Sequence, residues 1–207
     1  SEEFYHGRMN LQALITVLYK SVTEFPVTGF RTYFTSNHDE NSWNGTEFEK
    51  YGDAANLMAV FSCTWNGIPM IYSGQEMPNK KRLKFFEKDA IDWNGNFELH
   101  DFFKTLLILH SSNKALRAGD PDIMTKIVSH PDDHEVFSYL RKNEDSQVLV
   151  ILNCCNYEKD VQVKGVHGVF RNVFGGDDVN FDFQDHVFLN AWGYLVFEKV
   201  PMLSEPK

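Results

Sequence analysis

Apolar residues recur every three or four positions near the start of the chain, at Leu11, Leu14, Ile15 and Leu18. This spacing places them on one face of a helix. The helix is expected to stop before Pro26, because a proline disfavours helical backbone in the residue that precedes it. The first predicted element is therefore a helix with one buried face.

Two strand-like segments, with a helix between them, come next in the sequence. Residues 30–35 are rich in aromatic and β-branched side chains and lead into the polar motif Asn37-His38-Asp39. Residues 51–65 are apolar nearly all round, which predicts a buried helix. Residues 68–72 form a continuous apolar run, typical of a strand covered on both faces. This order predicts a parallel pair of strands, with the polar motif at the carboxyl end of the first strand.

The pattern changes in the second half of the chain. Residues 77–96 lack periodicity and predict a long loop, and residues 99–116 resume helical spacing. After Gly119-Asp120-Pro121 come short apolar runs separated by turn-rich segments, which predict an antiparallel sandwich. The sequence thus predicts an α/β domain at 1–120 and an all-β domain at 121–207. The expected strands of the second domain are residues 136–141, 147–153, 161–163, 168–174, 187–189 and 193–198.

Composition and charge exclude several classes of partner. Of the 207 residues, 43% are hydrophobic and 14% aromatic, which is enough for a substantial core. The formal net charge of −9 opposes binding to phosphate backbones, so nucleic acid is not expected as a partner. No stretch approaches the roughly 20 apolar residues of a membrane span, so no membrane partner is expected either. The sequence leaves the localisation undetermined.

Neither the cysteines nor the acidic runs predict a metal site. Cys63, Cys154 and Cys155 lack the spacing of zinc ligands and are interpreted as small packed side chains. The aspartates at 132–133 and 177–178 lie in turn-like segments, whose backbone Asp and Gly adopt without help from a cation. No cofactor is therefore predicted for this chain.

Several motifs follow one another in a fixed order. Asn37-His38-Asp39 is followed by the Gly-x-Pro-x-x-Tyr-x-Gly-x-Glu pattern of residues 67–76, and then by residues 86–93, 113–117 and 192–194. Together these motifs resemble the α-amylase family of glycoside hydrolases, glycoside hydrolase family 13. The resemblance covers nearly the whole chain and implies the carboxyl-terminal portion of such an enzyme. The implied fold is α/β followed by all-β: the last two β/α units of a TIM-type (β/α)8 barrel and a small antiparallel Greek-key β-sandwich.

The resemblance implies a retaining glycosidase that acts on α-glucans such as starch and maltooligosaccharides. The family uses a nucleophilic Asp, an acid/base Glu and a third Asp that stabilises the transition state, and Asp39 matches only the third. Retention needs the nucleophile and the acid about 5 to 5.5 Å apart, and one carboxylate cannot fill both roles. The segments closest to the nucleophile's Arg-x-Asp pattern, Arg8-Met9-Asn10 and Arg171-Asn172, lack the Asp. The isolated chain is therefore expected to be inactive.

The resemblance also implies substrate-binding roles. His38 is expected to donate a hydrogen bond to sugar hydroxyls, and Asn37 is expected to support the geometry of the turn. Arg82 lies where family members place sugar-binding residues, although the charged run Lys80-Lys81-Arg82 is also compatible with a solvated surface. Glu76 is given a structural role near the strand end.

The tryptophans leave alternatives open. Trp43 follows the His-Asp pair, so its indole could stack on the apolar face of a sugar ring or pack in the core. Trp65, Trp93 and Trp192 lie among apolar or turn residues and are interpreted as packing residues.

Other functions and partners remain open at this level. One alternative is a non-catalytic carbohydrate-binding or structural β-sandwich module, and another is a fragment of a transglycosylase or isomerase of the same clan. Two barrel strands with open edges would expose unpaired backbone and apolar surface. Self-association or a complementary barrel fragment is therefore expected as a partner. Calcium is expected only in the intact enzyme, in barrel segments outside this chain.

Overall fold

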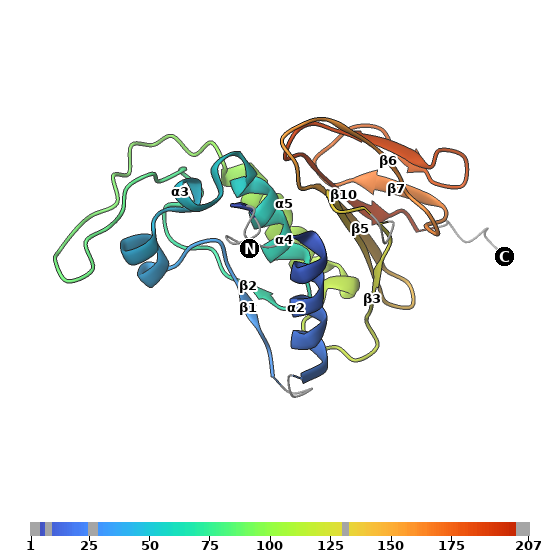
Figure 1. Cartoon of the computed structure of the whole chain (residues 1–207), viewed down its shortest axis with the longest axis horizontal. Coiled ribbons are helices and arrows are strands. Elements are labelled where there is room, and N and C mark those ends of the chain that lie inside the picture. The colour runs from blue at the N-terminus through green and yellow to red at the C-terminus, as the bar shows by residue number, and fades with distance from the viewer. Residues whose placement is uncertain (1–4, 7–9, 25–28, 130–132, 202–207) are drawn as a thin grey trace.

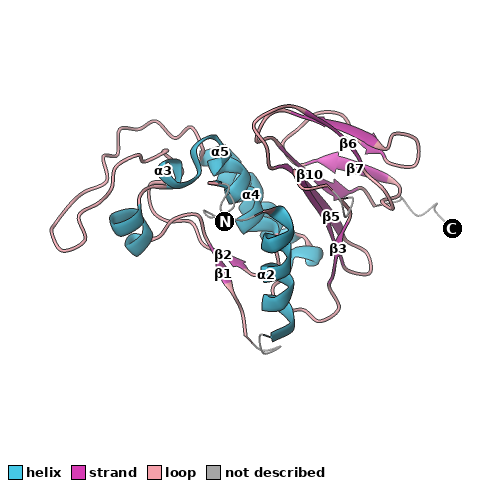
Figure 2. Cartoon of the chain, in the orientation of Figure 1, coloured by secondary structure: helices cyan, strands magenta, loops and turns pink. Residues whose placement is uncertain are grey.

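The computed structural model describes residues 5–6, 10–24, 29–129 and 133–201. Helices and one short parallel sheet make up the first part of the chain, and antiparallel strands make up the second (Figures 1 and 2). This order of an α/β part followed by a β part is the order that the sequence predicted. Asp132, in one of the acidic runs, lies outside the described residues.

The first predicted helix is α2, Leu11–Glu24, which buries Leu11 and Leu18 as its spacing requires. The second, α4, spans Ala55–Thr64 and is buried on nearly all sides. It begins later than predicted because a short helix, α3 (Glu47–Tyr51), and the 3-10 turn η2 (Gly52–Ala54) precede it.

The third helix, α5, spans His100–Ser112 and ends earlier than the sequence predicted. Asn113 leaves the helical conformation, and its side-chain oxygen accepts a hydrogen bond from the Ala115 amide at 2.9 Å. This bond caps the 3-10 turn η3, Lys114–Leu116. Asparagine favours such local capping over continuing a helix.

Two short strands form the parallel pair. β1 (Thr32–Tyr33) lies beside β2 (Ile68–Pro69), and the Ile68 amide donates to the Arg31 carbonyl at 2.8 Å. Both strands are shorter than the predicted segments 30–35 and 68–72, because each has a hydrogen-bonding neighbour on only one side among the described residues. Their carboxyl ends lie at the same edge, since the strands run in the same direction.

The second part of the chain contains a six-stranded antiparallel sheet in the order β3-β4-β5-β10-β7-β8 and a two-stranded antiparallel sheet of β6 and β9. All six predicted strands are present with small shifts at their ends. The sequence missed β3 and β8, which are short and rich in polar residues. The strands are β3 Met124–Ile127, β4 Val136–Lys142, β5 Gln147–Asn153, β6 Lys159–Gln162, β7 Val169–Asn172, β8 Val179–Asn180, β9 His186–Leu189 and β10 Tyr194–Lys199.

The six-stranded sheet is covered on both faces. Alternate residues of β5, such as Val148 and Val150, belong to the core shared with α4 and α5, and the residues between them, Leu149 and Ile151, belong to the core shared with β6 and β9. Figure 1 shows α4 and α5 on one side of this sheet and β6 on the other. The central strands therefore read as continuous apolar runs instead of alternating ones.

Polar contacts also join the helices to the sheet. The Tyr139 hydroxyl lies 2.6 Å from the Thr64 hydroxyl, and Asn113 donates to the Glu198 carboxylate at 2.6 Å. The Arg141 guanidinium is buried and donates to the Ala115 carbonyl at 3.2 Å and to the Thr125 hydroxyl at 2.6 Å. Buried polar groups that are paired in this way fix the relative position of the layers.

Cys63, Cys154 and Cys155 are free thiols that are buried or half-buried, in agreement with their interpretation as packed side chains. Burial raises the pKa of Cys63 and of Cys154 to about 12. Such thiols are protonated at neutral pH and are therefore poor nucleophiles. In the part of the chain that the structure describes, no helix combines the length and the apolar character needed to cross a membrane.

Candidate functional site

The turn after β1 is fixed by Asn37. Its backbone carbonyl accepts a hydrogen bond from the Asn41 amide at 2.8 Å, and its side-chain oxygen accepts one from the Glu40 amide at 2.7 Å. These bonds begin a short helical turn at residues 38–39, which continues into the single π-helical turn η1, Glu40–Asn44. Such π-turns are rare and occur frequently at functional sites. The position of Asn37 is consistent with the predicted role in supporting this turn.

His38 and Asp39 project into solvent from the helical turn that follows β1. Their side chains are 70% and 58% exposed, and His38 Nε2 lies 3.6 Å from Asp39 Oδ2, too far for a direct hydrogen bond. The His38 ring stacks against Phe85, with ring centroids 6.2 Å apart and planes inclined by 19°. Both side chains therefore keep their polar atoms accessible to a ligand.

The carboxyl end of β2 is tied to the same turn. Gln75 Nε2 donates to the Thr35 hydroxyl at 2.8 Å, and Gln75 Oε1 accepts from the Tyr72 amide at 2.8 Å. The Glu76 carboxylate accepts from the Gly74 amide at 3.0 Å, a contact within its own loop that is consistent with a structural role. The loops after the two strands are thereby held next to each other.

Two buried charged side chains lie in α3, the helix that follows this turn. Glu47 and Lys50 of α3 are buried, and Lys50 Nζ lies 3.2 Å from the Glu40 carboxylate. Thr46 and Glu49 form a capping box at the start of α3: the Glu49 amide donates to the Thr46 hydroxyl at 3.3 Å, and the Thr46 amide donates to the Glu49 carboxylate at 2.8 Å. Sequence reasoning missed α3, although Thr-x-x-Glu is a recognisable signal for a helix start.

Replacing Glu47 with glutamine is expected to raise the free energy of unfolding at neutral pH. Burial raises the pKa of Glu47 above its ordinary value, an effect only partly offset by hydrogen bonds and by Lys50. The folded state therefore binds this proton more tightly than the unfolded chain does. The contribution to stability is fully present below the ordinary pKa and is lost as the pH rises through the folded-state pKa. A neutral side chain of the same shape removes that loss.

Urea denaturation at about pH 4 and about pH 7 measures the effect, because this range spans the ordinary pKa of a glutamate. The increase in the free energy of unfolding caused by Glu47→Gln should be larger at the higher pH. A variant that is less stable than the parent at neutral pH would contradict the argument.

Arg82 is held by a carboxylate of the protein. Its Nε lies 3.0 Å from both carboxylate oxygens of Glu49, and this contact lowers the pKa of Glu49. Gly45 makes room for the pair: its φ is +113°, and a Cβ there would lie 2.9 Å from Arg82 Nη2. The sequence predicted either sugar binding or a solvated surface for Arg82, and the ion pair with Glu49 was not anticipated.

Trp43 is 57% exposed, so the alternative of core packing is wrong. Its ring contacts Phe85 and Phe86, with centroid distances of 5.4 and 5.9 Å. Trp93 is also exposed, which corrects its interpretation as a packing residue, whereas Trp65 is buried in the core as predicted. Trp93 lies in the long loop after β2, outside both hydrophobic cores, a placement that its own sequence window does not reveal.

The exposed aromatic residues border a shallow hollow of about 340 Å³. Arg82, Lys84 and Glu87 supply charged groups to its lining, and Trp43, Phe85 and Phe86 supply aromatic ones. Among the described residues, no group of three or more His, Cys, Asp or Glu side chains is arranged to hold a metal ion. The arrangement offers aromatic faces and hydrogen-bonding groups next to the His38 and Asp39 side chains.

Comparison with known proteins identifies the family to which the chain belongs. The family model described as the alpha-amylase catalytic domain matches residues 2–118, more than half of the chain. The chain therefore belongs to the alpha-amylase family, and the motif-based resemblance is confirmed.

Particular relatives agree with this assignment. Over 159 residues the chain is 26% identical to alpha-amylase 2 of Dictyoglomus thermophilum, an alignment that covers 71% of this chain and 26% of the relative. It is 28% identical over 156 residues to the 1,4-alpha-glucan branching enzyme GlgB of Bacillus cereus, covering 70% of this chain and 23% of the enzyme. The chain thus spans about a quarter of the length of these relatives.

The fold is shared with solved amylase structures. The structure of a noncanonic maltogenic alpha-amylase, AmyB, from Thermotoga neapolitana superposes with a TM-score of 0.78 at 18% sequence identity. The match covers 97% of this chain and 48% of that protein. Both the helical part and the antiparallel sheets are therefore arranged as in an amylase.

Proposed function

We propose that this chain is the carboxyl-terminal portion of an α-amylase-type retaining glycosidase that acts on α-glucans. Residues 1–120 would supply the last two β/α units of the catalytic barrel, and residues 121–207 would form a Greek-key β-sandwich. The parallel pairing of β1 with β2 and the sheet order of the second part are compatible with this division. The proposal rests on the family match together with one observation: His38 and Asp39 are exposed at the carboxyl edge of the parallel strands, where barrel enzymes carry their active sites.

Each residue of the motif has a proposed role. Asp39 would hold sugar hydroxyls more tightly in the distorted, oxocarbenium-like transition state than in the relaxed ring, which lowers the barrier. His38 would donate a hydrogen bond to a sugar hydroxyl, and Asn37 would keep the turn in shape. Arg82 would contribute to substrate binding from the rim, with its guanidinium oriented by Glu49.

The isolated chain is expected to release no reducing sugar from starch or maltooligosaccharides. Asp39 alone supplies neither the nucleophile nor the acid of a retaining mechanism. Activity that disappears in an Asp39→Asn variant would contradict this expectation, because it would mean that both missing carboxylates lie within the chain.

Binding provides a positive test of the site. Titration calorimetry with maltoheptaose should show weak binding by the chain, and His38→Ala should weaken it about fivefold, the loss of one hydrogen bond of about 1 kcal/mol. His186→Ala is a matched control, because His186 is also exposed and lies 2.9 Å from an aspartate, Asp160, on the far side of the sandwich. Equal effects of the two substitutions would contradict the proposed role of His38.

A second candidate function is glucan transfer. The match to a branching enzyme is comparable in identity and coverage to the match to the amylase. Family members that transfer glucan chains and members that hydrolyse them would share the roles proposed above for His38 and Asp39. This chain is therefore compatible with both reactions. Measuring branch formation against reducing-sugar release in the full-length protein separates the two functions.

We expect the isolated chain to self-associate unless a complementary barrel fragment covers it. An apolar hollow of about 960 Å³ lies between β2 and α5, with Ile68, Ile71, Phe103, Leu107 and Ile108 in its lining. Burying such a surface is favourable by about 25 cal/mol per Å². Light scattering after size-exclusion chromatography should show a species larger than a monomer.

Substitutions test whether the apolar hollow is the surface through which the chain self-associates. Ile108→Lys should shift the distribution toward monomer, because a charge would be buried in the contact. Met124→Lys, at an equally exposed apolar side chain on β3, should leave the distribution unchanged. A parent chain that is monomeric over a wide concentration range would contradict the expectation.

A further inference from the structure

One part of the loop between β2 and α5 presents aromatic side chains to solvent. We call residues 81–89 the aromatic arm, because Phe85 and Phe86 lie at its centre, Phe86 being 84% exposed. The two rings meet edge to face at 4.9 Å, and both contact the exposed Trp43 of η1. The loop that carries the arm extends away from the helices in Figures 1 and 2.

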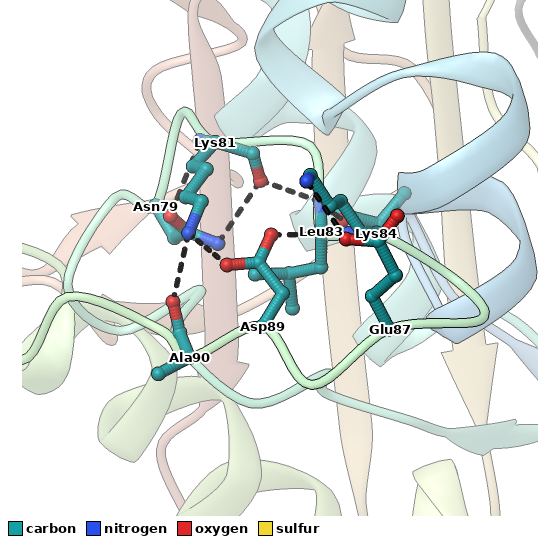
Figure 3. Close-up of polar contacts among 8 residues, drawn as sticks. Asn79, Lys81, Leu83, Lys84, Glu87, Asp89 and Ala90 are labelled. Carbon is teal, nitrogen blue, oxygen red and sulfur yellow. Dashed lines mark hydrogen bonds and ion pairs between the residues drawn. The ribbon is translucent and has the colours of Figure 1, made fainter.

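The arm is closed by a charged clamp at its base, shown in Figure 3. The Asp89 carboxylate accepts from Lys81 Nζ and, at 3.1 Å, from the Lys84 amide. Lys81 Nζ also donates to the Ala90 carbonyl at 3.1 Å. The contact with Lys81 holds the pKa of Asp89 below its ordinary value. Asp89 therefore joins the two ends of the arm as a carboxylate at neutral pH.

A buried amide ties the arm to the candidate site. Asn41 Oδ1 accepts from the Leu83 amide at 2.8 Å, and Asn41 Nδ2 donates to the Lys81 carbonyl at 3.2 Å. Asn41 lies in η1, the turn that follows Asp39 and also carries Trp43. The arm and the His38-Asp39 turn are thus parts of one hydrogen-bonded unit.

This geometry indicates a ligand with apolar faces and a hydroxylated edge. The clamp holds Phe85 and Phe86 in solvent, whereas an unrestrained loop could fold them against the protein and bury apolar area. The charged groups of Arg82, Lys84 and Glu87 border the same hollow of about 340 Å³. Aromatic faces beside hydrogen-bonding groups suit a pyranose, whose C–H face is apolar and whose rim carries hydroxyls.

The position of the arm specifies which part of a ligand it contacts. Phe85 contacts both Trp43 and the His38 ring, with centroid distances of 5.4 and 6.2 Å. A sugar that is held by His38 therefore lies within reach of Phe85. The hollow that Phe85 also lines offers room for a neighbouring sugar.

We propose that the aromatic arm binds a glucose residue of an α-glucan next to the one held by His38 and Asp39, and that Asp89 is its positioning residue. This inference rests on the proposed function and extends the site to residues of the loop after β2. Phe85 and Phe86 make the contact, and Asp89 acts only through the shape of the arm.

Maltoheptaose binding to the full chain, measured by titration calorimetry, tests the contact. The Phe85→Ala/Phe86→Ala variant should bind about tenfold more weakly, the effect of losing about 1.4 kcal/mol of stacking. Phe183→Ala is the matched control, because Phe183 is an exposed phenylalanine of the sandwich. This variant should bind maltoheptaose with the affinity of the parent. Circular dichroism should show the same fold in all variants, since the side chains removed are exposed.

The clamp needs a separate readout. Asp89→Ala and Lys81→Met should each lower the affinity about threefold. The double variant should lose clearly less than the two losses combined, because both substitutions remove the Lys81–Asp89 contact. Asp89→Glu should restore part of the affinity, and the melting temperature should be the same throughout. Losses of affinity that are additive, or that are accompanied by a lower melting temperature, would overturn the positioning role of Asp89.

The outcomes separate this inference from the proposed function. Binding that is weakened by His38→Ala but not by the phenylalanine substitutions would overturn the arm and leave the His38 site standing. Weakening by the phenylalanine substitutions alone would support the arm and count against the role of His38. A parent chain that binds no maltoheptaose would overturn both.

Discussion

Replacing Phe137 with alanine is expected to lower the free energy of unfolding by about 4 kcal/mol. Phe137 is 1% exposed and lies on β4, where its ring contacts those of Phe61, Trp65 and Tyr139 at centroid distances of 6.1, 5.6 and 5.1 Å. Truncation removes these contacts and leaves a cavity between α4 and the sheet, which the surrounding rings fill only in part. Urea denaturation followed by circular dichroism measures the loss.

The matched control is Phe183→Ala, which removes the same side chain from an exposed position and should cost no more than about 0.5 kcal/mol. The experiment also reports on cooperativity. Because Phe61 and Trp65 belong to the helical part and Phe137 to the sheet, the helices and strands should lose stability together. Separate transitions, with the substitution affecting only one of them, would contradict a shared core.

Replacing Gly67 with alanine is expected to cost about 3 kcal/mol and to disturb the candidate site. An added Cβ would lie 2.5 Å from the Tyr33 ring and 2.6 Å from the Arg31 carbonyl oxygen. That oxygen accepts the hydrogen bond from the Ile68 amide that joins β1 to β2. The strands must separate to admit the methyl group, and the turn carrying His38 and Asp39 shifts with β1.

Two measurements check this prediction. Urea denaturation gives the stability loss, and maltoheptaose titration shows whether binding falls as well. Gly95→Ala is the control, because a Cβ there meets nothing within 4 Å and the cost, about 1 kcal/mol, comes from the positive φ of +81° alone. A Gly67→Ala variant that matches this control in stability and binding would contradict the close approach of the two strands.

Local patterns predicted the elements that are long or strongly apolar. α2 and α5 followed from helical spacing, and β4 and β5 followed from apolar runs bounded by turn residues. β3 and β8 were missed because each has few apolar residues and exists through pairing with a neighbour, β4 or β7. Pairing is a non-local interaction that a short window of sequence does not contain.

In the candidate site, too, local sequence signals predicted some features and non-local contacts decided the others. The order of motifs indicated His38 and Asp39 as accessible groups at a strand end, and the structure places their side chains in solvent at that position. The partner of Arg82 was not predicted, since Glu49 lies 33 positions away along the chain and meets it through a tertiary contact. The exposure of Trp43 was also undecided in the sequence, because an indole serves equally well in a core and on a sugar-binding surface.

The sequence by itself determined the family, the change from α/β to antiparallel structure, and the identity of the polar residues at the end of β1. These features depend on residue type, spacing and order along the chain. The tertiary structure alone decided that the six-stranded sheet is covered on both faces and that Arg82 pairs with Glu49. It also decided that Asp89 and Asn41 fix the loop whose Phe85 ring stacks against His38. These depend on contacts between distant segments, which form only when burial of apolar surface brings the segments together.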